Sequence, residues 1–109
     1  MLNRREELFL LAVFRIGQGA YLVNVREHLK EHAKKNWAFG SVHLILERLT
    51  QKGLLRASIG EPEARPGGKA IKYYSMTPAG IDALAGAKRM NDEMWKEFND
   101  YALNLKKDQ

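Results

Sequence analysis

The sequence contains no cysteine and little of what marks secreted, fibrous or membrane proteins. Without cysteine there is no disulfide framework, no thiol nucleophile and no thiolate ligand for zinc or an iron–sulfur cluster. Three prolines and nine glycines are too few for a low-complexity or collagen-like chain. The longest apolar run, Leu8 to Phe14, is too short to cross a bilayer. These absences predict a cytoplasmic protein that has no membrane segment.

What remains is an ordinary globular composition with an uneven charge. The 109 residues are 45% hydrophobic and 28% charged, which fits one domain that buries roughly 65% of its unfolded surface. The net charge of +5 is concentrated between Arg26 and Lys72, where ten Lys or Arg face five Glu. Residues 78–109 have a net charge of −1. A basic middle third favours an anionic partner, although a solvated basic surface explains the same count.

Apolar spacing predicts three helices in the first half of the chain. Residues 4–16 are apolar around most of a helix, which therefore needs burial on two sides. Two further apolar stripes at helical spacing follow, the second of them ended by Gly53 as a left-handed cap. The stripe residues are Leu22, Val25 and Leu29, and then Val42, Ile45, Leu46 and Leu49.

The second half predicts a hairpin and a long helix. Residues 55–59 and 71–76 alternate as strands, with a loop over residues 60–69 between them. Thr77 and Pro78 supply a capping hydroxyl and a first-turn proline for a final helix that extends to about Lys106. At about 1.5 Å per residue this helix is roughly 40 Å long, which is more than a core of this size covers.

The order helix, helix, helix, strand, loop, strand predicts a winged helix-turn-helix, mainly α with a small β-hairpin wing. We expect residues 1–77 to form this DNA-binding domain and residues 78–109 to form a long C-terminal dimerisation helix. In such folds the third helix enters the major groove of double-stranded DNA, and the wing reaches phosphates or the minor groove. The predicted DNA-contacting residues are Lys35, Ser41, His43, Leu44, Arg48, Arg65 and Lys69.

Three of these residues have side chains suited to base or phosphate contact. Arg48 matches guanine in a bidentate pair, Leu44 suits a thymine methyl, and the Ser41 hydroxyl suits a phosphate or a base edge. Glu47 either accepts from cytosine or pairs with neighbours of Arg48. For each residue the alternative is an ordinary exposed side chain.

The sequence also resembles a known family. The segments FGSVHLILERLTQKGLL and KYYSMTPAG, together with the predicted wing, are similar to PadR-like winged-helix transcriptional regulators over nearly the whole chain. The small pair Gly40 and Ser41, the strand end at residues 73–74, and Thr77 with Gly80 match the family pattern. His43 stands where the family usually has tyrosine. The resemblance implies the compact subgroup, in which the last helix dimerises.

The final helix itself predicts a homodimer. Its apolar side chains recur at spacings of three and four residues and extend beyond the expected core, so a partner helix is the simplest cover. Asn91 interrupts this stripe, and it either fixes the register or is simply exposed. The two DNA-binding domains of the dimer would then bind major grooves about 34 Å apart. The predicted interface residues are Leu8, Met94, Phe98, Tyr101 and Leu105.

The resemblance also implies an effector site. A tryptophan on the last helix of ligand-responsive members lies near the dimer interface, and Trp95 occupies that region here with Phe98 nearby. We therefore expect these two residues to bind a planar apolar small molecule. The alternative is that Trp95 is only a packing anchor of the dimer.

The sequence contains no complete motif for catalysis or metal binding. His28 and His32 belong to an H-x-x-E-H pattern, but no third ligand is evident and the surroundings are basic. No catalytic triad, phosphate loop or carboxylate pair is visible, so the sequence predicts neither an enzyme nor a cofactor. We predict a homodimeric DNA-binding transcriptional repressor. The alternative is a dimeric winged-helix adaptor that binds proteins and not DNA, which has no need of a basic middle third.

Overall fold

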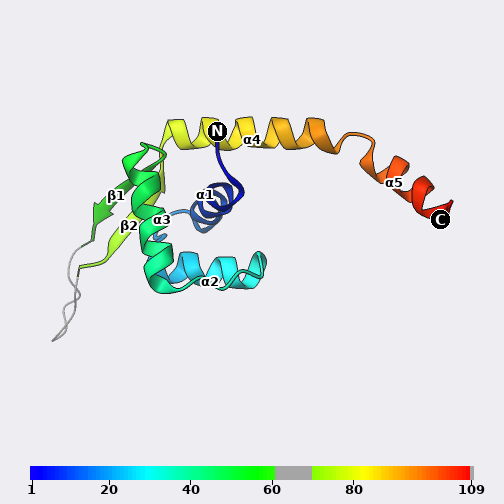
Figure 1. The fold of residues 1–109 in the computed structure, drawn as a ribbon. Helices are drawn as coiled ribbons and strands as arrows, with labels where there is room; N and C mark the ends of the chain where they lie inside the picture. Colours follow the sequence, from blue (N-terminus) through cyan, green and yellow to red (C-terminus); the bar gives the residue numbers. More distant parts are fainter. Residues whose placement is uncertain (61–69, 109) are drawn as a thin grey trace.

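A computed structural model describes residues 1–60 and 70–108 of the chain (Figure 1). It confirms the three predicted N-terminal helices and the hairpin, so the fold is mainly α with a two-stranded antiparallel sheet. The elements are α1 (Arg4–Ile16), α2 (Leu22–His32), α3 (Phe39–Gln51), β1 (Leu55–Ile59), β2 (Lys72–Met76), α4 (Pro78–Trp95) and α5 (Phe98–Lys107).

Helix α1 is the centre of the fold. It begins with a capping box, in which the Asn3 side chain accepts from the Glu6 N–H and the Glu6 carboxylate accepts from the Asn3 N–H. It then buries residues on the faces that meet α2, α3 and α4, as its nearly all-round apolar pattern requires. The fully buried side chains of the core include Phe9, Leu10, Val13, Val25, Val42, Leu46, Leu49 and Leu55.

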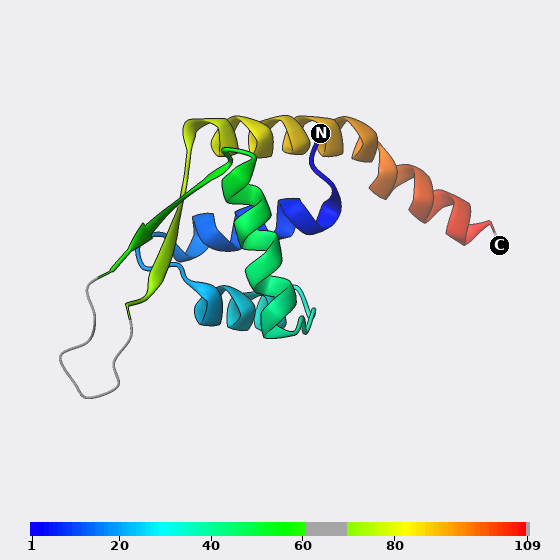
Figure 2. The same ribbon diagram turned by 60° about the vertical axis from the view of Figure 1, so that its left-hand side comes forward.

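The hairpin is attached to the helical body through its second strand. β1 and β2 pair with Leu55 opposite Met76 and Ile59 opposite Lys72. The Tyr74 N–H donates to the Ala20 carbonyl at 2.9 Å, and Tyr73 forms an isolated bridge with Tyr21. The hairpin therefore leaves the body at a fixed place, beside α3 (Figure 2).

The C-terminal region differs from the single long helix that the sequence predicts. The Thr77 hydroxyl accepts from the Gly80 N–H at 3.0 Å, so the predicted cap is confirmed, but α4 ends at Trp95. Lys96 has ψ 136° and Glu97 lies in the left-handed region at φ 65°, so two residues separate α4 from α5. Neither glycine nor proline marks this break, and the sequence therefore gives no signal of it.

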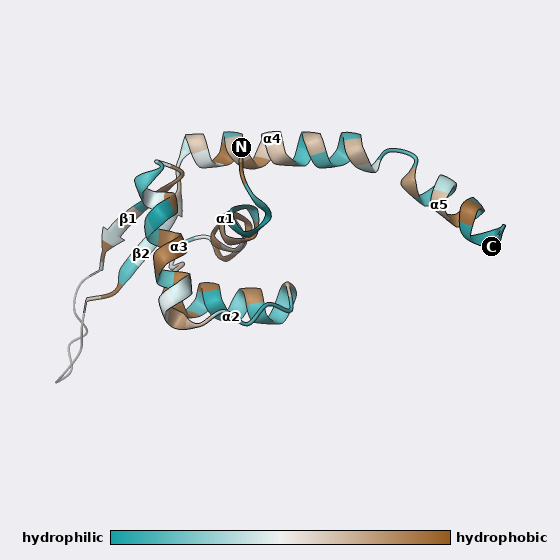
Figure 3. Cartoon of the chain, in the orientation of Figure 1, coloured by the Kyte–Doolittle hydropathy of each residue, from teal (hydrophilic) through white to brown (hydrophobic). Residues whose placement is uncertain are grey.

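The far end of α4 and the whole of α5 extend away from the body (Figure 1). The radius of gyration is 17.6 Å, whereas about 13 Å is typical of a compact chain of this length. Hydropathy colouring shows apolar residues on α5 where no other element covers them (Figure 3). Among the helices of the described residues, none is long and apolar enough to cross a membrane.

Candidate nucleic-acid interface

Helix α3 presents one buried face and one exposed face. The buried face carries the apolar stripe that packs against α1 and α2. On the exposed face Leu44 keeps 63% of its surface accessible, although leucine is normally buried. Four predicted DNA-contacting residues are therefore brought together and turned outward on α3: Ser41, His43, Leu44 and Arg48.

The other three predicted contacts do not lie on this helix. Lys35 is exposed in the connection between α2 and α3, after Lys34, whose φ of 56° turns the chain away from α2. Arg65 and Lys69 fall outside the residues that the structure describes. The strands that lead to them, β1 and β2, lie beside α3 (Figure 2).

Arg26 holds the connection that positions the start of α3. Its Nε donates to the Trp37 carbonyl at 2.7 Å, and its Nη2 donates to Asn36 Oδ1 at 3.3 Å. The guanidinium also lies over the Phe39 ring, 4.2 Å from the centroid. In the sequence Arg26 counts only among the cations of the basic segment, whereas in the structure its side chain binds the backbone that precedes α3.

Glu47 does not face outward with Arg48. Its Oε1 accepts from Lys72 Nζ at 2.6 Å and from the Tyr74 hydroxyl at 2.7 Å. The hydrogen bond from Lys72 is the main cause that holds the pKa of Glu47 below its ordinary value. Of the two roles left open by the sequence, pairing with a neighbour is the one that the structure shows, although that neighbour lies on β2.

The predicted interface residues occupy two different regions. Leu8 is half-buried on α1, where it packs against the core. The other four lie on the extended C-terminal region, and Met94 keeps 79% of its surface accessible. They are Met94, Phe98, Tyr101 and Leu105, all exposed.

The first half of the predicted stripe is covered by the same chain. Leu84 packs against the core, and Asn91 Nδ2 donates to Glu7 Oε2 on α1 at 3.1 Å. Asn91 therefore joins α4 to α1 and is half-buried, so it is not simply exposed, whereas a role in the register of a dimer stays a prediction.

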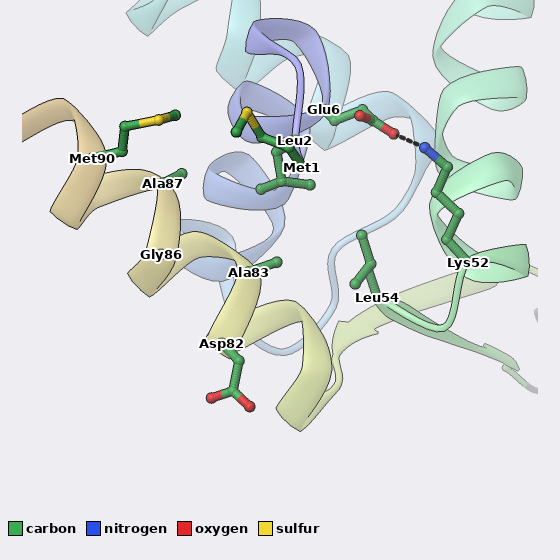
Figure 4. Close-up of a pocket in the computed structure, with 10 residues that line it drawn as sticks. All are labelled: Met1, Leu2, Glu6, Lys52, Leu54, Asp82, Ala83, Gly86, Ala87 and Met90. Atoms are coloured by element: carbon green, nitrogen blue, oxygen red, sulfur yellow. Dashed lines mark hydrogen bonds and ion pairs between the residues drawn. The ribbon is translucent and has the colours of Figure 1, made fainter.

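Trp95 and Phe98 are in contact across the break between α4 and α5. Their ring centroids are 4.9 Å apart, with the rings at 75°. Trp95 also lines a pocket of about 400 Å³ between α4 and the start of α1, together with Leu2 and Met90. Leu2 and Met90 also line the adjoining cavity of about 560 Å³ (Figure 4). Binding of a planar apolar molecule at Trp95 and Phe98 stays a prediction.

The two histidines of the H-x-x-E-H pattern stack on α2. Their ring centroids are 4.3 Å apart, and burial is the main cause that lowers the pKa of His28. Across the described part of the chain, no group of three or more ligating side chains is placed to hold a metal ion.

Comparison with known proteins identifies the fold. Neither a family model nor a curated protein matches the sequence. Among solved structures, a PadR-like transcription factor from Bacteroides fragilis aligns with 25% identity and a TM-score of 0.66 over 93% of this chain and 88% of its own. A PadR family transcription regulator from Clostridium difficile R20291 aligns with 21% identity and a TM-score of 0.66 over 94% and 97%.

A third solved structure, the winged-helix DNA-binding protein F93 from STIV, has only 13% identity but a TM-score of 0.66 over 89% of this chain and 97% of its own. Each of these three alignments covers at least 89% of this chain and at least 88% of the other. The resemblance to PadR-like transcription regulators is therefore confirmed, and this chain shares their winged helix-turn-helix fold.

Proposed function

We propose that the chain is a homodimeric transcriptional repressor that binds double-stranded DNA through α3 and the hairpin. Residues 1–77 bind DNA and residues 78–109 dimerise. The observation that carries this proposal is the exposed face of α3, where Arg48 and Leu44 stand outward on a helix whose opposite face is fully packed. A rigid helix with exposed polar and apolar side chains suits readout of base edges in the major groove.

The charge of the sequence agrees with an anionic partner. The surplus of +5 lies between Arg26 and Lys72, a segment that contains α3, β1 and the first residue of β2. The solved structures that align with the chain are described as transcription regulators and as a winged-helix DNA-binding protein. The adaptor without DNA binding remains the alternative function, and the experiment below separates the two.

Replacing Arg48 with alanine should remove discrimination at one base position. The purified protein is first incubated with fragmented genomic DNA from the organism that encodes it, and the retained fragments are sequenced to obtain a binding site. Arg48→Ala should then weaken binding to that site by about 1 to 3 kcal/mol and relax the preference at one position, because a bidentate contact to guanine is lost. Binding is measured by fluorescence anisotropy at one fixed salt concentration.

Arg89→Ala is the matched control, because Arg89 is an exposed arginine on α4 and not on α3. It should leave the base preference unchanged. If the parent protein retains no DNA, the adaptor function replaces this proposal. If Arg48→Ala binds the selected site like the parent, Arg48 does not read a base.

The dimer part of the proposal rests on two uncovered apolar surfaces. One is the apolar stripe of α5, formed by Phe98, Tyr101, Ala102 and Leu105. The other is a groove of about 450 Å³ between α1 and α4, whose exposed apolar walls include Phe14 and Ile81. An isolated helix of 10 residues is marginal in water, so α5 needs packing that the described residues of its own chain do not supply. A second copy of the chain covers both surfaces.

Light scattering should therefore give twice the chain mass of 12.5 kDa at micromolar concentration. Phe98→Asp should weaken dimerisation at least about 30-fold, because it places a carboxylate in an apolar contact. Leu103→Asp is the control, since Leu103 is exposed on α5 but lies off the stripe, and it should leave the dimer intact. A monomeric parent, or equal effects of the two variants, would contradict this interface.

A further inference from the structure

Glu47 joins the exposed helix to the hairpin. It is the only acidic residue of α3, and a single oxygen, Oε1, receives both Lys72 Nζ and the Tyr74 hydroxyl. Both donors lie on β2 two residues apart, so their side chains lie on the same face of the strand. The contact therefore links α3 to one defined face of the hairpin.

Each donor is itself fixed at a different place. Tyr74 is 4% exposed in the core, and its backbone N–H is held by the Ala20 carbonyl. Lys72 pairs with Ile59, which is the last residue of β1 before the segment that connects the strands. Glu47 thus connects a rigid core residue to the base of the wing.

The contact is ionic at neutral pH. The hydrogen bonds from Lys72 and then Tyr74 keep the pKa of Glu47 low, whereas burial first, and then Glu47, raises the pKa of Tyr74. Glu47 is therefore a carboxylate, Tyr74 keeps its proton, and the ion pair of Glu47 with Lys72 has no net charge. Without this pairing, a carboxylate next to Arg48 would repel DNA phosphates.

We propose that Glu47 is a positioning residue that sets the angle between α3 and the hairpin, so that Arg48 and the wing meet a single DNA site in one register. Glu47 does not itself contact DNA. This inference rests on the proposed DNA binding.

Loss of the Glu47 charge has two consequences with opposite signs. The hairpin keeps its backbone attachment at Ala20 and Tyr21 but loses its side-chain link to α3, so its angle to α3 varies more and specific binding weakens. The Lys72 ammonium is released at the same time and becomes available to any phosphate, so non-specific binding strengthens. If Glu47 had a purely electrostatic role, its loss would strengthen binding to all DNA alike.

The first experiment compares Glu47→Gln with the parent on the selected site and on a shuffled fragment. The specificity ratio, which is the dissociation constant for the shuffled fragment divided by that for the selected site, should fall three- to tenfold. Binding to the shuffled DNA should become more salt-dependent by about one phosphate contact. Lys72→Met should lower the ratio without strengthening non-specific binding, because no ammonium is released.

Glu31→Gln is the matched control, since it removes one exposed carboxylate from α2 and leaves the hairpin contact intact. It should leave the ratio unchanged. If Glu47→Gln and Lys72→Met both keep the parent's ratio, Glu47 has no positioning role. Lys72→Met retains the bond from Tyr74 to Glu47, so it gives the result even where Glu47→Gln fails to fold.

A second experiment needs no DNA and so remains decisive if the proposed function fails. Because the chain has no cysteine, spin labels can be attached at Lys30→Cys on α2 and Ser58→Cys on β1, both of which are exposed positions. The distribution of distances between the labels should broaden in Glu47→Gln and Lys72→Met but not in Glu31→Gln. An unchanged distribution in the first two variants would overturn the inference, whatever the protein binds.

Discussion

Replacing Gly80 with alanine is expected to lower the free energy of unfolding by about 3 kcal/mol, which is the upper end of the usual cost of overpacking. Gly80 is buried in the first turn of α4, and a Cβ atom there would overlap the backbone carbonyl oxygen of Leu54. That oxygen cannot move freely, because it accepts from the Thr77 N–H at 3.3 Å. Helix α4 must therefore shift away from the start of the hairpin.

Thermal unfolding at fixed protein concentration measures this effect, and the Tm should fall by at least about 10 °C. Gly86→Ala is the matched control in the same helix, since the nearest atom to its added Cβ is the end of the flexible Arg89 side chain at 3.7 Å. It should stabilise by about 0.5 to 1 kcal/mol, because alanine favours the helix interior. Equal changes at the two positions would refute the packing argument.

Gly80 also shows why the fold was predictable from the sequence. The spacing from Thr77 to Gly80 appears in the sequence as a cap and in the structure as a close approach of two backbones. The stripe of α3 and the alternation of β1 and β2 are likewise local patterns that each specify one element. Local signals that agree with the tertiary packing are what sequence reasoning detects best.

Contacts between elements were not predictable in the same way. Arg26 and Glu47 look like ordinary polar residues of helical faces, yet each has partners 10 or more positions away along the chain. Periodicity places a residue on a face and does not identify the partner that the fold brings to it. The break after Trp95 is undetectable for a related reason, because Lys96 and Glu97 are good helix formers in sequence.

Lys52→Met is expected to destabilise the protein by about 3 kcal/mol at neutral pH. Lys52 follows α3 and pairs with Glu6 on α1 (Figure 4), and the Glu6 side chain is only 6% exposed. Among the residues that the structure describes, removal of the lysine leaves the buried carboxylate with the Asn3 N–H as its one donor, a situation that is strongly unfavourable. Adding Glu6→Gln to Lys52→Met removes the buried charge and should restore most of the lost stability.

The dependence on pH distinguishes this charge effect from lost packing. In the parent, the hydrogen bond from Lys52 is the main cause that lowers the pKa of Glu6 from 4.5. The unfolded chain therefore binds more protons than the folded chain in the range below that value, and this part of the stability is lost as the pH falls through the folded pKa. In Lys52→Met the pKa of Glu6 rises, because burial now opposes its charge with less compensation.

Acid should therefore cost the Lys52→Met variant less stability than it costs the parent. The gap of about 3 kcal/mol at pH 7 should narrow to roughly 1 kcal/mol or less near pH 3, as measured by urea unfolding at each pH. Glu47 also has a lowered pKa, but it is present in both proteins and its contribution cancels in the difference. With Glu6→Gln added, the difference from Glu6→Gln alone should stay small at every pH. A gap that is constant between pH 7 and pH 3 would show that Lys52 acts through its aliphatic chain and not through the buried charge of Glu6.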